Sequence, residues 1–158
     1  MDITLTILNF NRSKFLDRSL RSCLDQVLSN KRIEVIIVDD ASTDNSLKYL
    51  KGFKNHIRLF KNKTNKGPGF CSNLAARKAR GKYFIRVDSD DYLNKYSVQM
   101  MSEILDYNKD IALVYSDHFR VDEFGFKQKI VKKPRIFVGF FRFASLKIIR
   151  QILERKSN

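Results

Sequence analysis

A cluster of aspartates follows directly on a run of alternating apolar residues. Residues 83–87 alternate large apolar side chains as a buried strand does, and Asp88, Asp90 and Asp91 come next. Carboxylates at this spacing repel one another unless a positive charge offsets them. Mg2+ and Mn2+ are hard cations that carboxylate oxygens favour, and they bind diphosphates on their open side. An Asp-rich turn that caps the next helix is the alternative interpretation, because Asp and Ser are common turn residues.

A second pair of carboxylates ends an earlier strand. Residues 33–38 form a nearly continuous β-branched run, which is typical of a central parallel strand covered on both faces. Asp39 and Asp40 follow it. In parallel α/β sheets the ligand crevice lies at the carboxyl ends of the strands, and two acidic strand ends at one edge need a ligand or a cation to offset their repulsion. The sequence therefore predicts a nucleotide-and-metal site at this edge.

Strands and helices alternate along the chain to position these carboxylates. Ser13 is the expected N-cap of the first helix, Ser42 or Asp44 caps a short one, Pro68 suits the first turn of another, and Gly81 ends it. The alternation predicts an α/β fold with right-handed crossovers and a mostly parallel sheet. We expect strands at residues 3–8, 33–38, 57–61, 82–87 and 111–116, an edge strand at 127–131, and helices at 13–28, 68–80 and 94–107.

The charge of the chain is concentrated in its C-terminal segment. The formal net charge is +14 over 158 residues, and residues 127–158 hold ten Lys and Arg against one acid, Glu154. Nucleic-acid binding would call for basic residues and stacking aromatics spread over a face, so we expect no nucleic-acid partner. No apolar stretch approaches the roughly 18 residues of a membrane span. The N-terminus does not resemble a signal peptide, and the isolated Cys23 and Cys71 fit a reducing cytoplasm.

Four short motifs carry a resemblance to a known family. They are Asn11-Arg12, Val38-Asp39-Asp40-Ala41-Ser42-Thr43-Asp44, Asn65-Lys66-Gly67, and Gly81-Lys82-Tyr83 leading to Asp88-Ser89-Asp90-Asp91. In this order and spacing the chain resembles the family 2 glycosyltransferases over about residues 2–125. The resemblance implies an α/β fold of the GT-A type, a three-layer α/β/α sandwich that binds a nucleotide sugar on a mostly parallel sheet.

The resemblance also implies roles for individual residues. Asp40 would hydrogen-bond the base of the donor, and residues 9–11 would line the base pocket. Asp88 and Asp90 resemble the family's DxD pair, which acts with Mn2+ or Mg2+ on the ribose and diphosphate, and Asp91 is a third candidate metal ligand. A UDP-sugar is the favoured donor. The expected nucleotide-sugar-binding residues are Asn9, Phe10, Asn11, Asp39, Asp40, Lys66, Gly67, Asp88, Ser89 and Asp90.

The implied activity is metal-dependent, inverting transfer of a sugar to a saccharide or lipid-linked acceptor, in the synthesis of cell-surface polysaccharide or glycans. A cation stabilises the charge that develops on the leaving diphosphate, and a carboxylate base deprotonates the acceptor. In the family that base lies in a C-terminal half beyond the DxD. Asp117 and Asp122 are the candidates here, and neither lies in a recognisable base motif. We therefore expect weak or absent transfer by this chain.

Two alternative functions stay open. A shortened, weakly active or inactive nucleotide-sugar-binding domain would share every motif above. A nucleotidyltransferase would use similar carboxylates with a nucleoside triphosphate, and it would need a Gly- and Arg-rich phosphate loop that residues 9–13 do not supply. Leu8 and Asn9 also stand where the family commonly has Pro-Thr, and Ser72 stands where an Arg is frequent. These differences are expected to alter the choice of donor.

The basic C-terminal segment is expected to form a second unit. We divide the chain into a nucleotide-sugar-binding domain at residues 1–125 and, at residues 126–158, a basic edge strand followed by an amphipathic helix from about residue 140 to 156. The helix would either pack its apolar side on the sheet or contact an anionic membrane through its Phe, Lys and Arg side chains. The second option places the protein in the cytoplasm at the inner face of the membrane.

Overall fold

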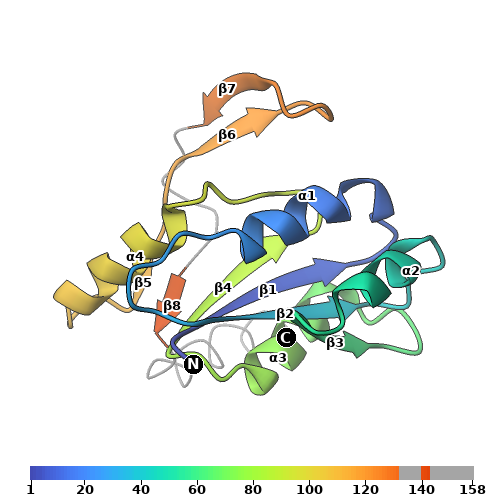
Figure 1. Cartoon of the computed structure of the whole chain (residues 1–158), viewed down its shortest axis with the longest axis horizontal. Helices are drawn as coiled ribbons and strands as arrows, with labels where there is room; N and C mark the ends of the chain where they lie inside the picture. The colour runs from blue at the N-terminus through green and yellow to red at the C-terminus, as the bar shows by residue number, and fades with distance from the viewer. Residues whose placement is uncertain (132–139, 143–158) are drawn as a thin grey trace, which may run out of the picture.

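The computed structural model describes residues 1–131 and 140–142. Within these residues a six-stranded sheet has the order β3-β2-β1-β4-β8-β5, and β6 and β7 form a separate two-stranded sheet (Figure 1). The elements are β1 (Ile3–Asn9), α1 (Ser13–Leu24), β2 (Ile33–Asp39), α2 (Ser46–Leu50), the 3-10 helix η1 (Lys51–Phe53), β3 (Ile57–Lys61), α3 (Gly67–Lys78), β4 (Tyr83–Asp88), α4 (Ser97–Tyr107), β5 (Leu113–Val114), β6 (His118–Val121), β7 (Lys127–Val131) and β8 (Phe140–Arg142).

The centre of the sheet is parallel, as the sequence predicts. β1 pairs in parallel with both β2 and β4, and β2 pairs in parallel with β3. In this register Leu8 lies between Val38 and Asp88. The three strands that precede the candidate site residues therefore end side by side at one edge of the sheet. The predicted α/β fold with a mostly parallel sheet is confirmed.

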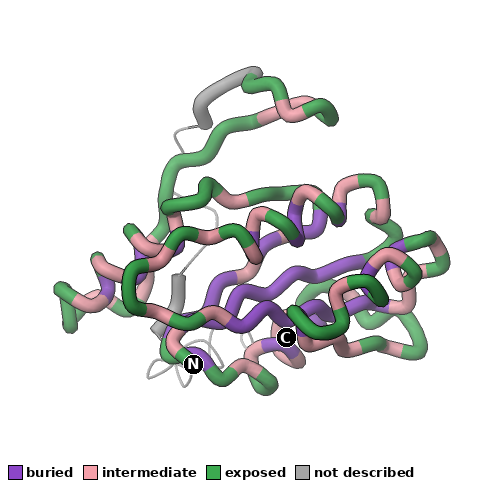
Figure 2. The backbone as a smooth tube through the Cα atoms, in the orientation of Figure 1, coloured by how far each residue is buried: buried purple, intermediate pink, exposed green. Residues whose placement is uncertain are grey.

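Helices cover both faces of the sheet because the side chains of its strands alternate. Ile3, Leu5 and Ile7 pack with residues of α1, α2 and α4 in the larger core cluster. Leu8 and Val38 point to the other face and pack against α3 in a smaller cluster. Figure 1 shows α1 and α3 on opposite faces, and Figure 2 shows that the central strands are the most continuously buried part of the chain.

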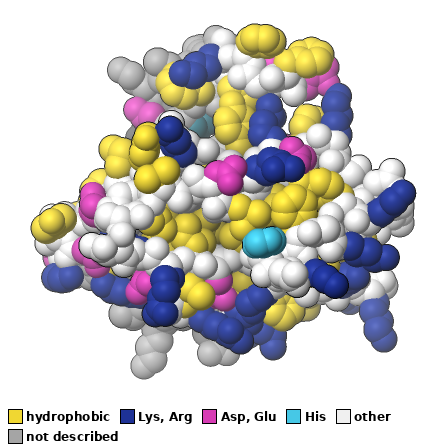
Figure 3. Space-filling model, viewed as in Figure 1, with side chains coloured by type: hydrophobic (Ala, Val, Ile, Leu, Met, Phe, Trp, Pro, Cys, Tyr) yellow, Lys and Arg dark blue, Asp and Glu magenta, His cyan; other side chains and the backbone are white. Residues whose placement is uncertain are grey.

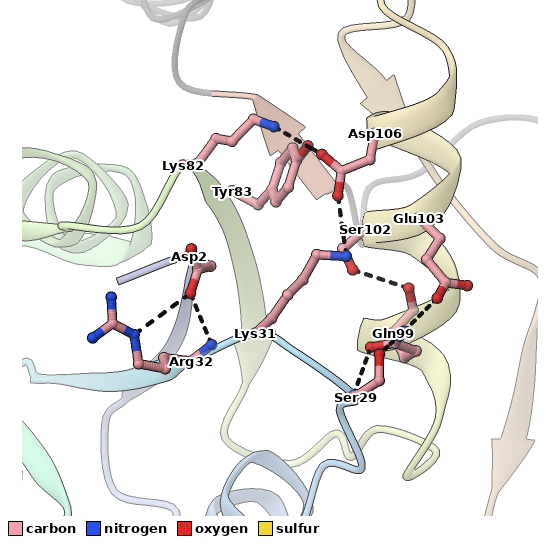
Figure 4. A network of polar contacts seen from close by, with 10 residues as sticks. All are labelled: Asp2, Ser29, Lys31, Arg32, Lys82, Tyr83, Gln99, Ser102, Glu103 and Asp106. Atoms are coloured by element: carbon pink, nitrogen blue, oxygen red, sulfur yellow. Dashed lines mark hydrogen bonds and ion pairs between the residues drawn. The ribbon is translucent and has the colours of Figure 1, made fainter.

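Polar contacts fix α4 to the amino end of the sheet, away from the carboxyl edge (Figure 4). Asp106 of α4 forms ion pairs with Lys31 at 3.0 Å and Lys82 at 2.8 Å, and it accepts a hydrogen bond from the Tyr83 hydroxyl. Burial raises the pKa of Asp106, but the hydrogen bonds from these three side chains lower it by more, so the pKa lies well below its usual value.

Several predicted boundaries are wrong by a few residues. The first helix ends at Leu24 rather than residue 28, because the Val27 backbone N–H donates to the Lys95 carbonyl instead of continuing the helix. Lys95, whose carbonyl accepts this bond, belongs to the loop before α4. That helix begins at Ser97 rather than at residue 94. The strand predicted at 111–116 is reduced to Leu113–Val114.

The region after β5 differs most from the sequence-based expectation. The strand predicted at 127–131 exists, but it pairs with β6 in a hairpin and not with the edge of the main sheet. Residues 140–142 were expected to begin the helix, and they form β8, which pairs antiparallel with β4. The rest of the predicted helix, residues 143–156, lies outside the described residues, and the domain boundary at 125 stays a prediction. Within the described part, no helix is long and apolar enough to cross a membrane.

Candidate functional site

The ends of β1 and β2 form a buried polar pair. The Asn9 side-chain amide donates to Asp39 Oδ2 at 2.8 Å and to Ser42 Oγ at 3.0 Å, and the Ser42 backbone N–H donates to Asp39 Oδ1 at 3.0 Å. Asn9 and Asp39 are buried. Asn9 Oδ1 is also buried, and it has no hydrogen-bond partner among the described residues. An unsatisfied buried acceptor costs roughly 1–3 kcal/mol, so this oxygen is a strained feature at the strand ends.

The loops that follow β1 and β2 are locked together. Asn11 Oδ1 accepts a hydrogen bond from the Thr43 backbone N–H at 2.8 Å, and the Asn11 backbone N–H donates to Ser42 Oγ at 3.0 Å. Asn11 and Ala41 have positive φ values of 53° and 66°. Asn adopts this left-handed conformation readily, whereas it costs Ala41 on the order of 1–2 kcal/mol, and strained residues of this kind cluster at functional sites.

Asp44 caps two helices from one loop. Its Oδ2 accepts a hydrogen bond from the Ser13 N–H at the start of α1 (2.8 Å), and its Oδ1 accepts one from the Ser46 N–H at the start of α2 (2.9 Å). Burial raises the pKa of Asp44, but the hydrogen bonds from Ser46 and Ser13 outweigh it and lower the pKa to about 2. The prediction that Ser13 caps the first helix is wrong, because the residue before it is Arg12 and the capping carboxylate comes from another loop.

Asp40 holds the turn that precedes α3. Asp40 Oδ1 accepts hydrogen bonds from the Asn62 side chain at 2.7 Å and from the Lys66 N–H at 2.9 Å, and Oδ2 accepts one from the Gly67 N–H at 2.8 Å. Burial raises the pKa of Asp40, but these bonds lower it below its usual value. Gly67 takes a φ of 81°, a conformation that favours glycine. Asp40 already accepts hydrogen bonds from these three groups, and its expected contact with the base of the donor stays a prediction.

The acidic run after β4 is balanced by two arginines. Arg86 donates from Nε and Nη2 to Asp88 Oδ1 at 3.0 and 2.8 Å, and Arg12 Nε lies 3.6 Å from Asp90 Oδ2. Asp91 has part of its side chain in solvent, yet the surrounding protein atoms, followed by the charges of Asp90 and Asp88, raise its pKa. Sequence reasoning missed Arg86, although a charge inside an apolar strand was a visible signal.

The predicted metal ligands do not form a preassembled centre. Among the described residues, no three His, Cys, Asp or Glu side chains are close enough together to hold a metal ion. Asp88 and Asp90 are about half exposed, with side-chain values of 48% and 47%. Mg2+ is commonly bound by one or two carboxylates together with substrate phosphates and water. The donor set therefore fits a cation that is completed by a diphosphate, and it does not fit a cage made by the protein alone.

The other predicted site residues differ in how exposed they are and in whether other groups already bind them. Phe10 is 45% exposed between the two asparagines of the first loop, and Ser89 is buried inside the acidic run. Asp122 Oδ1 accepts the backbone N–H groups of Phe124 and Phe126 in the hairpin turn. Asp122 therefore has a structural role that competes with any role as a base. Asp117 is exposed just before β6.

The fold defines a GT-A type transferase domain, and sequence comparison gives the family. The sequence profile "Glycosyl transferase family 2" matches residues 4–153, so the chain belongs to the family 2 glycosyltransferases. It is 36% identical to chondroitin synthase of Escherichia coli over 127 residues, which is 78% of this chain and 18% of that protein. It is 30% identical over 118 residues to the poly(ribitol-phosphate) beta-N-acetylglucosaminyltransferase TarS of Staphylococcus aureus, 72% of this chain and 21% of that protein.

Two solved structures share the fold. The crystal structure of residues 1–349 of TarS in complex with UDP-GlcNAc has a TM-score of 0.78 at 26% identity, over 95% of this chain and 48% of that one. A mannosyltransferase of Pyrobaculum calidifontis in complex with GDP-Man and Mn2+ has a TM-score of 0.74 at 17% identity, over 93% of this chain and 46% of that one. The chain thus spans about half of these two structures and about a fifth of the two curated relatives named above.

Proposed function

We propose that this chain binds a nucleotide sugar, with a UDP-sugar favoured, at the carboxyl ends of β1, β2 and β4, and that it acts as a glycosyltransferase domain. The observation that carries the proposal is that Asn9, Asp39 and Asp88 lie together at one edge of the sheet. Asn9 pairs with Asp39, and the preceding residue, Leu8, pairs with Asp88. The relationship to TarS, whose solved structures include complexes with UDP and UDP-GlcNAc, supports the choice of donor. The acceptor would be a saccharide or a lipid-linked saccharide of cell-surface polysaccharide or glycan synthesis.

The residues divide between recognition of the base and binding of the diphosphate. Asn9 would shape the base pocket from within, because its side-chain amide joins Asp39 at the end of β2 to Ser42 of the following loop. Phe10 is exposed beside it and would stack on the base. Asp40 would act one step away, by fixing the backbone of Lys66 and Gly67.

Asp88 and Asp90 would hold Mn2+ or Mg2+ together with the donor diphosphate, with Asp91 as a further ligand. When bound, such a cation stabilises the negative charge of the leaving diphosphate. Arg86 and Arg12 neutralise these carboxylates in the ligand-free protein. Among the described residues, the ion pair of Asp90 is the contact of 3.6 Å with Arg12, so Asp90 would be released more easily than Asp88, which accepts two closer bonds from Arg86.

We further propose that any transfer by this chain inverts the anomeric centre and is slow. An inverting transfer needs a carboxylate to deprotonate the acceptor. Asp122 is engaged in the hairpin turn, and Asp117 is exposed outside the strand ends. Hydrolysis of the nucleotide sugar would persist at a low rate, because water can replace the acceptor.

The experiment is an isothermal titration of UDP in the presence and absence of Mn2+. Asp90→Ala should abolish the part of the affinity that depends on Mn2+, and Asp110→Ala is the matched control, because Asp110 is exposed and lies beyond α4. The proposed site is wrong if Asp90→Ala binds UDP and Mn2+ as the parent chain does.

A further inference from the structure

The β6–β7 hairpin carries three exposed aromatic side chains that the proposed donor site does not use. Phe119, Phe124 and Phe126 are 49%, 77% and 72% exposed. The hairpin stands away from the main sheet at the top of Figure 1, and hydrophobic side chains gather there in Figure 3. Exposed apolar patches on a folded protein mark surfaces that bind a ligand or a partner. We define Phe119, Phe124 and Phe126 as the hairpin aromatic surface.

The hairpin turn is held beside the acidic run. Lys14 at the start of α1 forms an ion pair with Glu123 of the turn. A Cβ atom added to Gly125 would lie 3.0 Å from Arg18 Nη1 and 3.9 Å from the Tyr92 hydroxyl. Arg18 in turn stacks on the Tyr92 ring at 4.6 Å. Because Tyr92 directly follows residues 88–91, the turn lies on the side chain of the residue after the carboxylates that would hold the donor diphosphate.

The charge of this region favours a neutral ligand over a strongly anionic one. The hairpin, residues 118–131, contains two acids and three Lys or Arg, so its formal charge is only +1 in a chain of net charge +14. An anionic membrane or a nucleic acid would instead be met by an excess of positive charge. Lys127 Nζ lies 4.1 Å from the centre of the Phe119 ring, so this ring already contacts a cation. Phe124 and Phe126 are the more exposed members of the set.

We propose that the hairpin aromatic surface is a platform for the saccharide acceptor, with Phe124 and Phe126 stacking on the C–H faces of its pyranose rings. The fit is chemical: a pyranose ring is neutral, presents an apolar face to an aromatic ring, and keeps its hydroxyl groups in solvent. Burying that face removes apolar area from water, which is favourable. The proposal rests on the proposed transferase function, because it places the acceptor beside the donor carboxylates.

The test uses a fluorescent reporter that the chain does not otherwise contain, since it has no Trp. Phe124→Trp puts a single indole on the proposed platform. Tyr107→Trp, at a position that is 86% exposed at the end of α4, is the matched control. The probes are neutral trisaccharides of glucose, N-acetylglucosamine and galactose. We expect a saturable change of emission for Phe124→Trp and none for Tyr107→Trp. Adding Phe126→Ala to Phe124→Trp should weaken the apparent affinity roughly two- to tenfold, the range for one aromatic contact.

Three outcomes would overturn the platform. They are no response of Phe124→Trp to any of the trisaccharides, an equal response of the two reporters, and a response only to phosphatidylglycerol vesicles, which would make the hairpin a membrane contact. A parallel titration with UDP and Mn2+ separates this proposal from the proposed function. If UDP binds and no saccharide does, only the platform fails. If UDP does not bind, the donor site fails, and a saturable saccharide response would show a sugar-binding surface without the transferase role.

Discussion

Asp44→Ala should destabilise the fold, because one carboxylate caps two helices that frame the candidate site. The substitution removes the acceptor for the Ser13 and Ser46 backbone N–H groups. At about 1 kcal/mol for each cap, the expected loss in the free energy of unfolding at neutral pH is roughly 2 kcal/mol. The lowered pKa of Asp44 gives a similar value for this loss in the free energy of unfolding: a decrease from 3.8 to about 2 corresponds to roughly 2 kcal/mol. Solvent screening of this half-buried side chain reduces that figure to about 1–2 kcal/mol.

The same pKa fixes how the effect depends on pH. The pKa of Asp44 is lower in the folded protein, so its charged form contributes stability above the unfolded value of about 4, and the contribution is lost as the pH falls toward about 2. Urea unfolding should therefore give a difference in the free energy of unfolding between the parent chain and Asp44→Ala that becomes smaller as the pH falls from about 4 to about 2. Asp110→Ala, an exposed control, should stay within about 0.5 kcal/mol of the parent at neutral pH. A gap no larger than that of the control, or one that does not narrow in acid, would refute the capping role.

Three further perturbations test separate parts of the structure. Gly81→Ala should cost about 3 kcal/mol, because a Cβ there would lie 2.5 Å from the Thr4 backbone nitrogen, whereas Gly52→Ala, with open space around it, should be nearly neutral in the same urea assay. Arg86→Gln should strengthen binding of Mn2+ alone several-fold, since it removes a positive charge 2.8 Å from Asp88; unchanged binding by electron paramagnetic resonance would contradict this, and Arg77→Gln on α3 is the control. Replacing Lys147, Arg150 and Arg155 by Gln should weaken co-sedimentation with anionic vesicles about a hundredfold, at about 1 kcal/mol per basic residue. The same change at the exposed Lys48, Lys51 and Lys54 should have less effect, and failure of the parent chain to bind vesicles ends the membrane hypothesis.

The parallel core was predictable because its signals are local. The β-branched run of β2 and the apolar alternation of β4 each predict a buried strand from neighbouring residues alone. The apolar run at residues 111–116 indicated β5 but not its length of two residues, and β8, with three residues, carries no such signal. Residues 140–142 fit a helical pattern, but β4 presents backbone groups that need a partner, and pairing with β4 decides their conformation.

The residue types at the site were predictable, but their partners were not. Placing carboxylates after strands requires only the sequence and the rule that ligands bind at carboxyl ends. The partners of Asp40 lie more than twenty residues away in the chain, and Asp44 reaches Ser13 across 31 positions. No local pattern reports such contacts. The pairing of Arg86 with Asp88 is local, and it was missed because the strand was read for its apolar residues alone.

The most direct test of a nucleotide-sugar site is calorimetric titration of the whole chain with UDP, CDP, GDP and ADP, each with and without Mn2+. We expect UDP to bind most tightly and Mn2+ to strengthen its binding, because the base would stack on the exposed Phe10 beside the ends of β1 and β2 and the diphosphate would complete the cation's ligands at Asp88 and Asp90. Binding of none of the four nucleotides, or equal binding of all four that ignores Mn2+, would contradict the assignment of this edge of the sheet.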